Sequence, residues 1–193
     1  MRNRVQDKMK IILIRHGKTE GNYKKRYIGK TDEPLFDTKS IEGEYPECNN
    51  IISSPLTRCI ETAKFIYPNS KITICDNLRE CDFGDFENKS YEDLKDDEYY
   101  KKWLKSMGTL PFPNGESHES FKKRCVKGFY ECLDGRDTAF IIHGGSIMAI
   151  MQELFGGGFY DYQVKNGGGY VFSMKRRENG YFTANGTYYS IHS

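Results

Sequence analysis

The sequence contains no hydrophobic run long enough to cross a bilayer, which takes about 20 apolar residues. Its clearest apolar stretches, Ile11–Ile14 and Ile147–Met151, are far shorter. A strong charge of one sign is missing too, because 29 Lys and Arg residues oppose 27 Asp and Glu residues, a net charge of +2. We therefore expect neither a membrane nor a nucleic acid as a partner.

The start of the chain lacks the features of a secretory signal. The charged stretch Met1–Met9 is followed only by the short run Ile11–Ile14, whereas a signal peptide needs an apolar core of about 7 to 15 residues. We expect a cytoplasmic protein. The residues before Met9 are predicted to be a disordered leader, with Met9 as an alternative natural start.

Cysteine patterns typical of metal sites are also absent. Six cysteines are present, none at C-x-x-C spacing and none with a histidine close by in sequence: Cys48, Cys59, Cys75, Cys81, Cys125 and Cys132. In a chain without an export signal, such thiols stay reduced and pack as small apolar residues. We therefore expect neither a disulfide nor a metal ion.

The elements that the sequence does contain predict one α/β domain. A length of 193 residues suits a single domain with its own core. Four strands, each followed by a helix or loop, and a final hairpin predict a three-layer α/β/α sandwich with a mostly parallel sheet. The expected strands are Lys10–Ile14, Asn50–Ser53, Lys71–Cys75, Thr138–Ile142, Tyr170–Met174 and Tyr181–Ile191, the last two joined around Asn179–Gly180, and the expected helices are Leu56–Tyr67, Ser90–Lys105, Glu119–Leu133 and Ser146–Phe155.

The first strand ends in a cation, an imidazole and a glycine: Arg15, His16 and Gly17. Four consecutive aliphatic residues suit a strand that is covered on both faces, and glycine permits a tight turn. The polar stretch after Thr19 suits a helix start, where free N–H groups favour an anion. These features predict a phosphate site. From these residues alone, a solvated strand end remains an equal alternative.

The full string R-H-G-x-T-x-x-N, Arg15 to Asn22, resembles the signature of the histidine phosphatase superfamily, which includes phosphoglycerate mutases and many phosphomonoesterases. The resemblance implies that His16 is the nucleophile that accepts the phosphoryl group. It also implies that Arg15 and Asn22 line the phosphate pocket.

A second arginine follows the second strand. Ser54 is expected to cap the helix Leu56–Tyr67, with Pro55 at its first position. Arg58 then lies near the helix start, at the same sheet edge as His16. By spacing alone Arg58 is an ordinary solvated helix residue. The string S-P-L-T-R, however, resembles the second phosphate-binding arginine segment of the superfamily.

The loop Leu78–Glu87 is rich in carboxylates, and composition cannot rank its four acids. The pattern L-x-E-x-x-F-G-x-x-E resembles the segment that carries the general acid of the superfamily, which implies that role for Glu80. Glu87 is interpreted as part of the turn.

The strand Thr138–Ile142 also ends in a histidine followed by glycine. His143 resembles the second catalytic histidine of the superfamily, and Gly144 is counted with the phosphate-binding residues. His118 and His192 have no such context, so we interpret both as surface residues.

A lid insertion is expected at about residues 81–117. Tyr91, Tyr99, Trp103 and Phe112 offer rings to a substrate, although aromatic residues at helical spacing are also typical of a core. Superfamily mutases usually carry a longer lid. The helix that usually follows the proline-leucine segment, here Pro34–Leu35, is short or missing.

The resemblance implies a phosphomonoesterase that forms a phosphohistidine and needs neither metal nor cofactor. Arg15, Arg58 and His143 would hold the phosphate, and Glu80 would protonate the leaving group. The substrate is expected to be a small phosphorylated metabolite. The motif order is similar to α-ribazole phosphatases, which favours α-ribazole 5'-phosphate. A phosphoglycerate mutase, a broad-specificity sugar phosphatase and a non-catalytic phosphate binder stay as alternatives, and the oligomeric state is not predicted.

Overall fold

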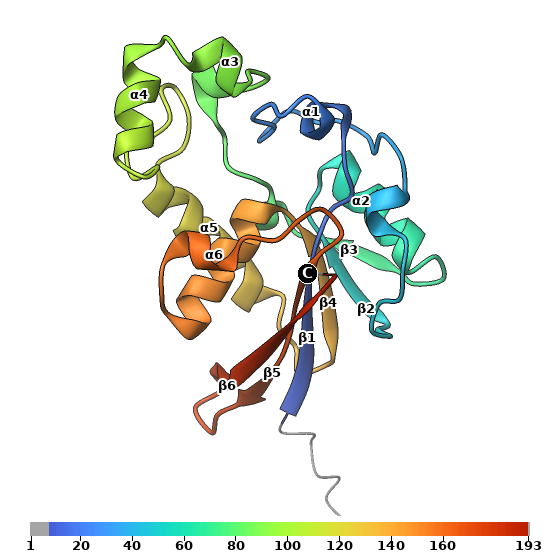
Figure 1. The fold of residues 1–193 in the computed structure, drawn as a ribbon. Coiled ribbons are helices and arrows are strands. Elements are labelled where there is room, and N and C mark those ends of the chain that lie inside the picture. The colour runs from blue at the N-terminus through green and yellow to red at the C-terminus, as the bar shows by residue number, and fades with distance from the viewer. Residues whose placement is uncertain (1–7, 193) are drawn as a thin grey trace, which may run out of the picture.

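Strand β1 (Lys8–Arg15) lies inside a six-stranded sheet of order β3-β2-β4-β1-β5-β6 in the computed structural model, which describes residues 8–192 (Figure 1). The other strands are β2 (Asn50–Ser53), β3 (Ile72–Ile74), β4 (Thr138–Ile142), β5 (Gly169–Arg176) and β6 (Phe182–Ile191). Strands β1 to β4 pair in parallel, and β5 and β6 are antiparallel. The predicted leader lies outside the described residues, except that Lys8 belongs to β1.

The side chains of β1 alternate between two cores. Ile11 and Leu13 pack with α5 (His118–Glu131) and α6 (Gly144–Phe155), whereas Ile12 and Ile14 pack with α2 (Thr57–Ile66) on the other face. All four side chains are fully buried, and burying each contributes roughly 1.5–3 kcal/mol. The helices therefore cover both faces of the sheet, as Figure 1 shows, and the predicted α/β class is confirmed.

The predicted helix Ser90–Lys105 is wrong, because the chain forms two shorter helices. The first, α3 (Tyr91–Leu94), begins with the expected capping box at Ser90. Asp97 then starts α4 (Glu98–Lys105) by accepting a hydrogen bond from the Tyr100 N–H at 2.7 Å. A second cap within the segment therefore interrupts the helix. Both helices lie beyond the carboxyl ends of the parallel strands (Figure 1).

The predicted role of Ser54 as the cap of α2 is also wrong. The helix begins at Thr57, whose N–H and hydroxyl donate to the two carboxylate oxygens of Asp32 at 2.7 and 2.9 Å. A residue 25 positions earlier in the chain therefore supplies the cap, and the Ser54 hydroxyl is left to bond elsewhere.

The remaining elements are short. They are α1 (Glu20–Tyr23) and the 3₁₀ turns η1 (Lys39–Ile41), η2 (Asp76–Leu78), η3 (Gly84–Phe86) and η4 (Phe159–Tyr162). Only η1 follows the proline-leucine segment, so the short structure expected there is confirmed. Among residues 8–192, no helix has both the length and the apolar character of a membrane span.

Candidate active site

The two strand-end histidines lie next to each other because β1 and β4 are neighbouring parallel strands. Arg15 is aligned with Ile142, so both strands end at one level of the sheet. The rings of His16 and His143 follow directly, with centroids 5.1 Å apart and planes at 65°. Residues separated by more than 120 positions in sequence thereby share one site.

A backbone hydrogen bond determines which nitrogen of His16 carries the proton. Nδ1 lies 2.7 Å from the carbonyl oxygen of Gly17, which only accepts, so Nδ1–H is the donor. A neutral ring then has its lone pair on Nε2. Burial, and then the positive charges of Arg58 and Arg15, lower the pKa of His16 well below its ordinary value. His16 is therefore neutral and able to act as a nucleophile.

Two guanidinium groups, one fully buried and one partly buried, lie beside this ring. Arg58 is fully buried and donates to the carbonyl oxygens of Thr31 at 2.7 Å and Gly29 at 2.8 Å. Arg15 donates to the Val164 carbonyl at 2.7 Å. Neither arginine forms an ion pair with a carboxylate within residues 8–192, and the buried Nε of each has no hydrogen-bond partner there. Two cations without an ion-pair partner, one of them fully buried, make the site suitable for an anion.

Ser54, which does not cap α2, holds the ring of His143 instead. Nε2 of this ring lies 2.7 Å from the Ser54 hydroxyl, and the Cys59 thiol is 3.5 Å from the same nitrogen. Burial is the largest cause that lowers the pKa of His143 well below its usual value, and the charge of Arg58 adds to it. The ring is therefore neutral and has a defined orientation.

Glu80 is the buried carboxyl group of the site. Its two oxygens accept hydrogen bonds from the N–H groups of Cys81 at 3.0 Å and Gly145 at 3.2 Å. Burial raises the pKa of Glu80, while these two donors and the nearby arginines partly oppose the shift. A Cβ atom at position 145 would collide with the Glu80 carboxyl group, so a side chain there would displace this carboxyl group from its present position. A carboxyl group with a raised pKa is suited to donate a proton.

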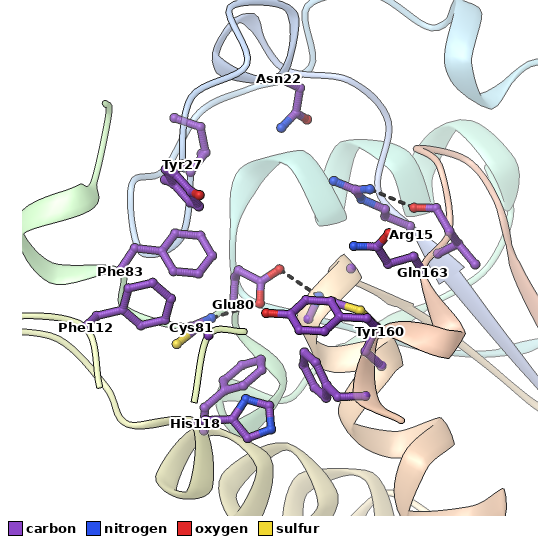
Figure 2. Close-up of a pocket in the computed structure, with 18 of the residues that line it drawn as sticks. Arg15, Asn22, Tyr27, Glu80, Cys81, Phe83, Phe112, His118, Tyr160 and Gln163 are labelled. Carbon is purple, nitrogen blue, oxygen red and sulfur yellow. Dashed lines mark hydrogen bonds between the residues drawn. The ribbon is translucent and has the colours of Figure 1, made fainter. Parts of the chain in front are cut away.

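A cavity of about 890 Å³ opens over these groups (Figure 2). Five of the seven predicted site residues line it: Arg15, His16, Asn22, Glu80 and Gly144. The other two, Arg58 and His143, are fully buried and are not part of the cavity lining. The structure therefore brings all seven to one end of the sheet.

The family follows from a comparison of the whole sequence. The model of the histidine phosphatase superfamily (branch 1) matches residues 11–180. The chain belongs to this superfamily.

Relatives of the chain include both phosphatases and mutases. It is 30% identical over 159 residues to the uncharacterized phosphatase PhoE of Bacillus subtilis, covering 76% of this chain and 78% of PhoE. It is 28% identical over 163 residues to the 2,3-bisphosphoglycerate-dependent phosphoglycerate mutase of Cytophaga hutchinsonii, covering 75% and 76% of the two chains. The alpha-ribazole phosphatase of Shigella flexneri superposes with a TM-score of 0.72 over 92% of this chain and 95% of that one, at 21% identity, which supports the shared fold.

Sequence reasoning missed Asn166, which joins two parts of the candidate site. Its Nδ2 donates to the carbonyl oxygen of His16 at 3.0 Å and to Oδ1 of Asn22 at 3.2 Å. Because both contacts of Asn22, from Asn166 and from the Thr19 N–H, use its oxygen, the Asn22 nitrogen remains a donor. Asn166 lies in a glycine-rich loop without a motif, so no local signal identifies it.

Glu87 does more than complete a turn. Its carboxylate accepts hydrogen bonds from the N–H groups of Gly29, Lys30 and Thr31, from the Thr31 hydroxyl and from the Phe83 N–H. The carbonyl groups of Gly29 and Thr31 are the ones that hold Arg58. Glu87 therefore supports the loop that orients a buried arginine.

The two histidines interpreted as surface residues are both partly exposed, and each has a partner. His118 begins α5, lines the cavity and packs edge to face on Phe159 at 4.3 Å. His192 is half-buried, with Nε2–H donating to the Glu44 carbonyl at 3.0 Å and its ring 4.7 Å from that of Tyr45.

All six cysteines are free. Within residues 8–192 no three metal-binding side chains of histidine, cysteine, aspartate or glutamate come together. The expectation that the reaction needs no metal stays a prediction.

Proposed function

We propose that the protein is a phosphomonoesterase that transfers the phosphoryl group of a small metabolite first to Nε2 of His16 and then to water. The observation that supports this proposal most strongly is the protonation state of the His16 ring. Its Nδ1 proton is bonded to Gly17, and burial beside two arginines keeps the ring neutral. A neutral imidazole with a free Nε2 is the form that attacks phosphorus.

Cationic and polar groups would hold the transferred phosphoryl group. In the proposal, Arg15 and Arg58 use their unpaired N–H groups to bind its oxygens, with Asn22 and the Gly144 N–H beside them. His143 donates a further hydrogen bond. Phosphoryl transfer depends mainly on position and charge stabilisation, which these groups supply. The proposed chemistry needs no metal ion and no cofactor for the same reason.

Glu80 would act in both steps. In the first, its protonated carboxyl group gives a proton to the leaving alkoxide as the phosphorus–oxygen bond breaks. In the second, the resulting carboxylate takes a proton from the water that attacks the phosphohistidine, which returns His16 and Glu80 to their starting states. The raised pKa of Glu80 supports this role.

For the substrate, we propose a phosphomonoester with a flat leaving group, and α-ribazole 5'-phosphate of cobalamin biosynthesis is the first candidate. The cavity, at about 890 Å³, lies near the upper end of the range for small-molecule sites. Two of the four aromatic side chains expected to offer rings, Trp103 and Phe112, line it. In this proposal the 81–117 segment acts as a lid.

A phosphoglycerate mutase is the second candidate. Arg26 and Lys165 line the cavity and form no ion pair within the described part of the chain, so they are available to a carboxylate or a second phosphate. Sugar phosphates would also fit near these groups. Side-by-side values of kcat/KM for α-ribazole 5'-phosphate and 3-phosphoglycerate, the latter with and without 2,3-bisphosphoglycerate, separate these candidates.

The phosphohistidine is tested with a ³²P-labelled substrate and rapid quench. We expect acid-labile, base-stable label on the wild type and on His192→Asn, and none on His16→Asn. Turnover is expected to continue in the presence of EDTA. Full activity of His16→Asn, or loss of wild-type activity with the chelator, would refute the mechanism.

A further inference from the structure

Two separate parts of the chain supply most of the aromatic lining of the cavity, and Tyr27 and Phe121 add one ring each. The first part is Phe83, Phe112 and Trp103 of the 81–117 segment, with ring centroids 4.9 Å apart for Phe83 and Phe112 and 5.1 Å apart for Phe112 and Trp103. The second part is Phe159 and Tyr160 of η4, whose centroids are 5.2 Å apart. Figure 2 shows the Tyr160 ring on the opposite side of the view from Phe83 and Phe112, with Glu80 drawn between them.

The two parts meet at Gly108, in the loop after α4. A Cβ atom at this position would collide with the Tyr160 hydroxyl and would lie 3.2 Å from Cζ2 of Trp103. Gly108 also has a φ of +74°, which favours glycine. Tyr160 therefore reaches from η4 to the 81–117 segment and closes one side of the cavity.

The aromatic part of the cavity begins directly beside the carboxyl group proposed as the acid. A Cβ atom at Gly145 would touch both the Glu80 carboxyl group and the ring of Phe121, which lines the cavity. Since Glu80 protonates the leaving oxygen in the proposed function, the substituent on that oxygen would extend into the space between the two groups of rings.

The other expected rings are directed elsewhere. The Tyr99 hydroxyl donates to the Pro111 carbonyl at 2.9 Å, and Tyr91 is 55% exposed; neither lines the cavity. The 81–117 segment, together with Tyr27, which packs on Phe83 and Trp103, therefore supplies one aromatic wall. The opposite wall depends on η4.

We propose that Tyr160 is a specificity-determining residue, whose ring binds a flat, apolar leaving group against Trp103 and Phe112. The inference rests on the proposed function, because that function decides which end of the substrate reaches these rings. Paired aromatic rings prefer offset or edge-to-face contacts. Stacking on an aromatic side chain corresponds to about a 5- to 150-fold preference for a ring-bearing ligand over one without a ring.

The competing explanation is that Tyr160 only holds the loop after α4 in place through its hydroxyl. The two explanations differ in what the hydroxyl contributes. Tyr160→Phe keeps the ring and removes the hydroxyl, whereas Tyr160→Ala removes both. A ring contact survives the first change, and a hydroxyl latch does not.

The test compares benzyl phosphate with propyl phosphate. Both release basic alkoxides and make similar demands on Glu80, so they differ mainly in the ring. We expect wild type and Tyr160→Phe to prefer benzyl phosphate in kcat/KM by about 5- to 150-fold, and Tyr160→Ala to reduce this ratio to about threefold or less. Tyr181→Ala is the matched control, because Tyr181 is 72% exposed and lies outside the cavity lining; it should behave as wild type.

A binding measurement separates this inference from the mechanism. Calorimetry with benzylphosphonate and propylphosphonate, which are not hydrolysed, should give the same preference in Kd and the same loss in Tyr160→Ala. If the enzyme turned over neither phosphate ester but bound the phosphonates in this way, the proposed function would fail and the role of Tyr160 would stand. Three results would overturn the proposed role of Tyr160: equal losses on both ligands in Tyr160→Ala, loss of the preference for the ring in Tyr160→Phe, or no such preference in the wild type.

Discussion

Replacing Glu87 by alanine should weaken both the fold and the phosphate site. The Glu87 carboxylate receives five hydrogen bonds, four of them from backbone N–H groups. A hydrogen bond to a charged group contributes about 1.5–3 kcal/mol, but water replaces part of this loss because Glu87 is only half-buried. We therefore expect a loss of about 2–4 kcal/mol in the free energy of unfolding, near the upper end for single substitutions. For a chain of this size the loss corresponds to a decrease of roughly 4–16 °C in Tm.

The effect on function follows from the loop that Glu87 supports. Gly29 and Thr31 would lose the anchor that holds their carbonyl groups against Arg58. A misplacement of about 1 Å at such a site reduces the rate by roughly 10²-fold, so we expect kcat/KM to fall by about 10- to 100-fold. The inhibition constant of inorganic phosphate should rise as well, because Arg58 is proposed to bind the anion directly.

Thermal unfolding followed by circular dichroism, together with phosphate inhibition, tests this reasoning. Glu92→Ala is the matched control, because exposed Glu92 pairs only with Lys95 among the described residues; it should change neither quantity. Glu87→Gln keeps one acceptor oxygen and should lie between wild type and Glu87→Ala. A Tm of Glu87→Ala within about 1 °C of wild type would refute the stability argument. A lowered Tm with an unchanged phosphate inhibition constant would show that Glu87 does not position Arg58.

Three further predictions concern titratable groups. Glu80→Gln should slow alkyl phosphates by about 10²- to 10⁴-fold and activated aryl phosphates far less, because only basic alkoxides need the proton; equal losses would assign the acid elsewhere. Burial lowers the folded-state pKa of His16 and His143, so the unfolded chain binds more protons below about pH 6.5. The free energy of unfolding, measured in urea, therefore retains the full contribution of both histidines above this pH. As the pH decreases below it, this free energy should fall by up to about 1.4 kcal/mol per pH unit for each histidine. A His16→Asn/His143→Asn variant with the wild-type dependence on pH would contradict this. Hydrogen bonding with the neighbouring Cys132 thiol lowers the pKa of Cys75; iodoacetamide should therefore label Cys75 before the buried Cys48, Cys59, Cys81 and Cys125, and earlier labelling of one of these four by mass spectrometry would disprove it.

Local sequence patterns were sufficient to predict those strands and helices that form because of their own residues. The apolar run before Arg15 predicts β1, and β2 and β4 have the predicted bounds, because burial on both faces selects continuous aliphatic runs in parallel strands. The order of strands and helices along the sequence was sufficient to predict the α/β class. Resemblance to the motifs of the superfamily identified the seven residues that the structure brings to one end of the sheet.

Tertiary structure decided the partners of these residues. The cap of α2 comes from Asp32, and Ser54, expected to provide it, orients His143 instead. Asn166 reaches His16 across 150 positions of sequence, and the Tyr160 hydroxyl lies against Gly108, more than 50 residues earlier. Helical or strand spacing describes only neighbours within one element. Contacts between elements depend on the order of strands in the sheet and on loop paths, which pattern alone does not specify.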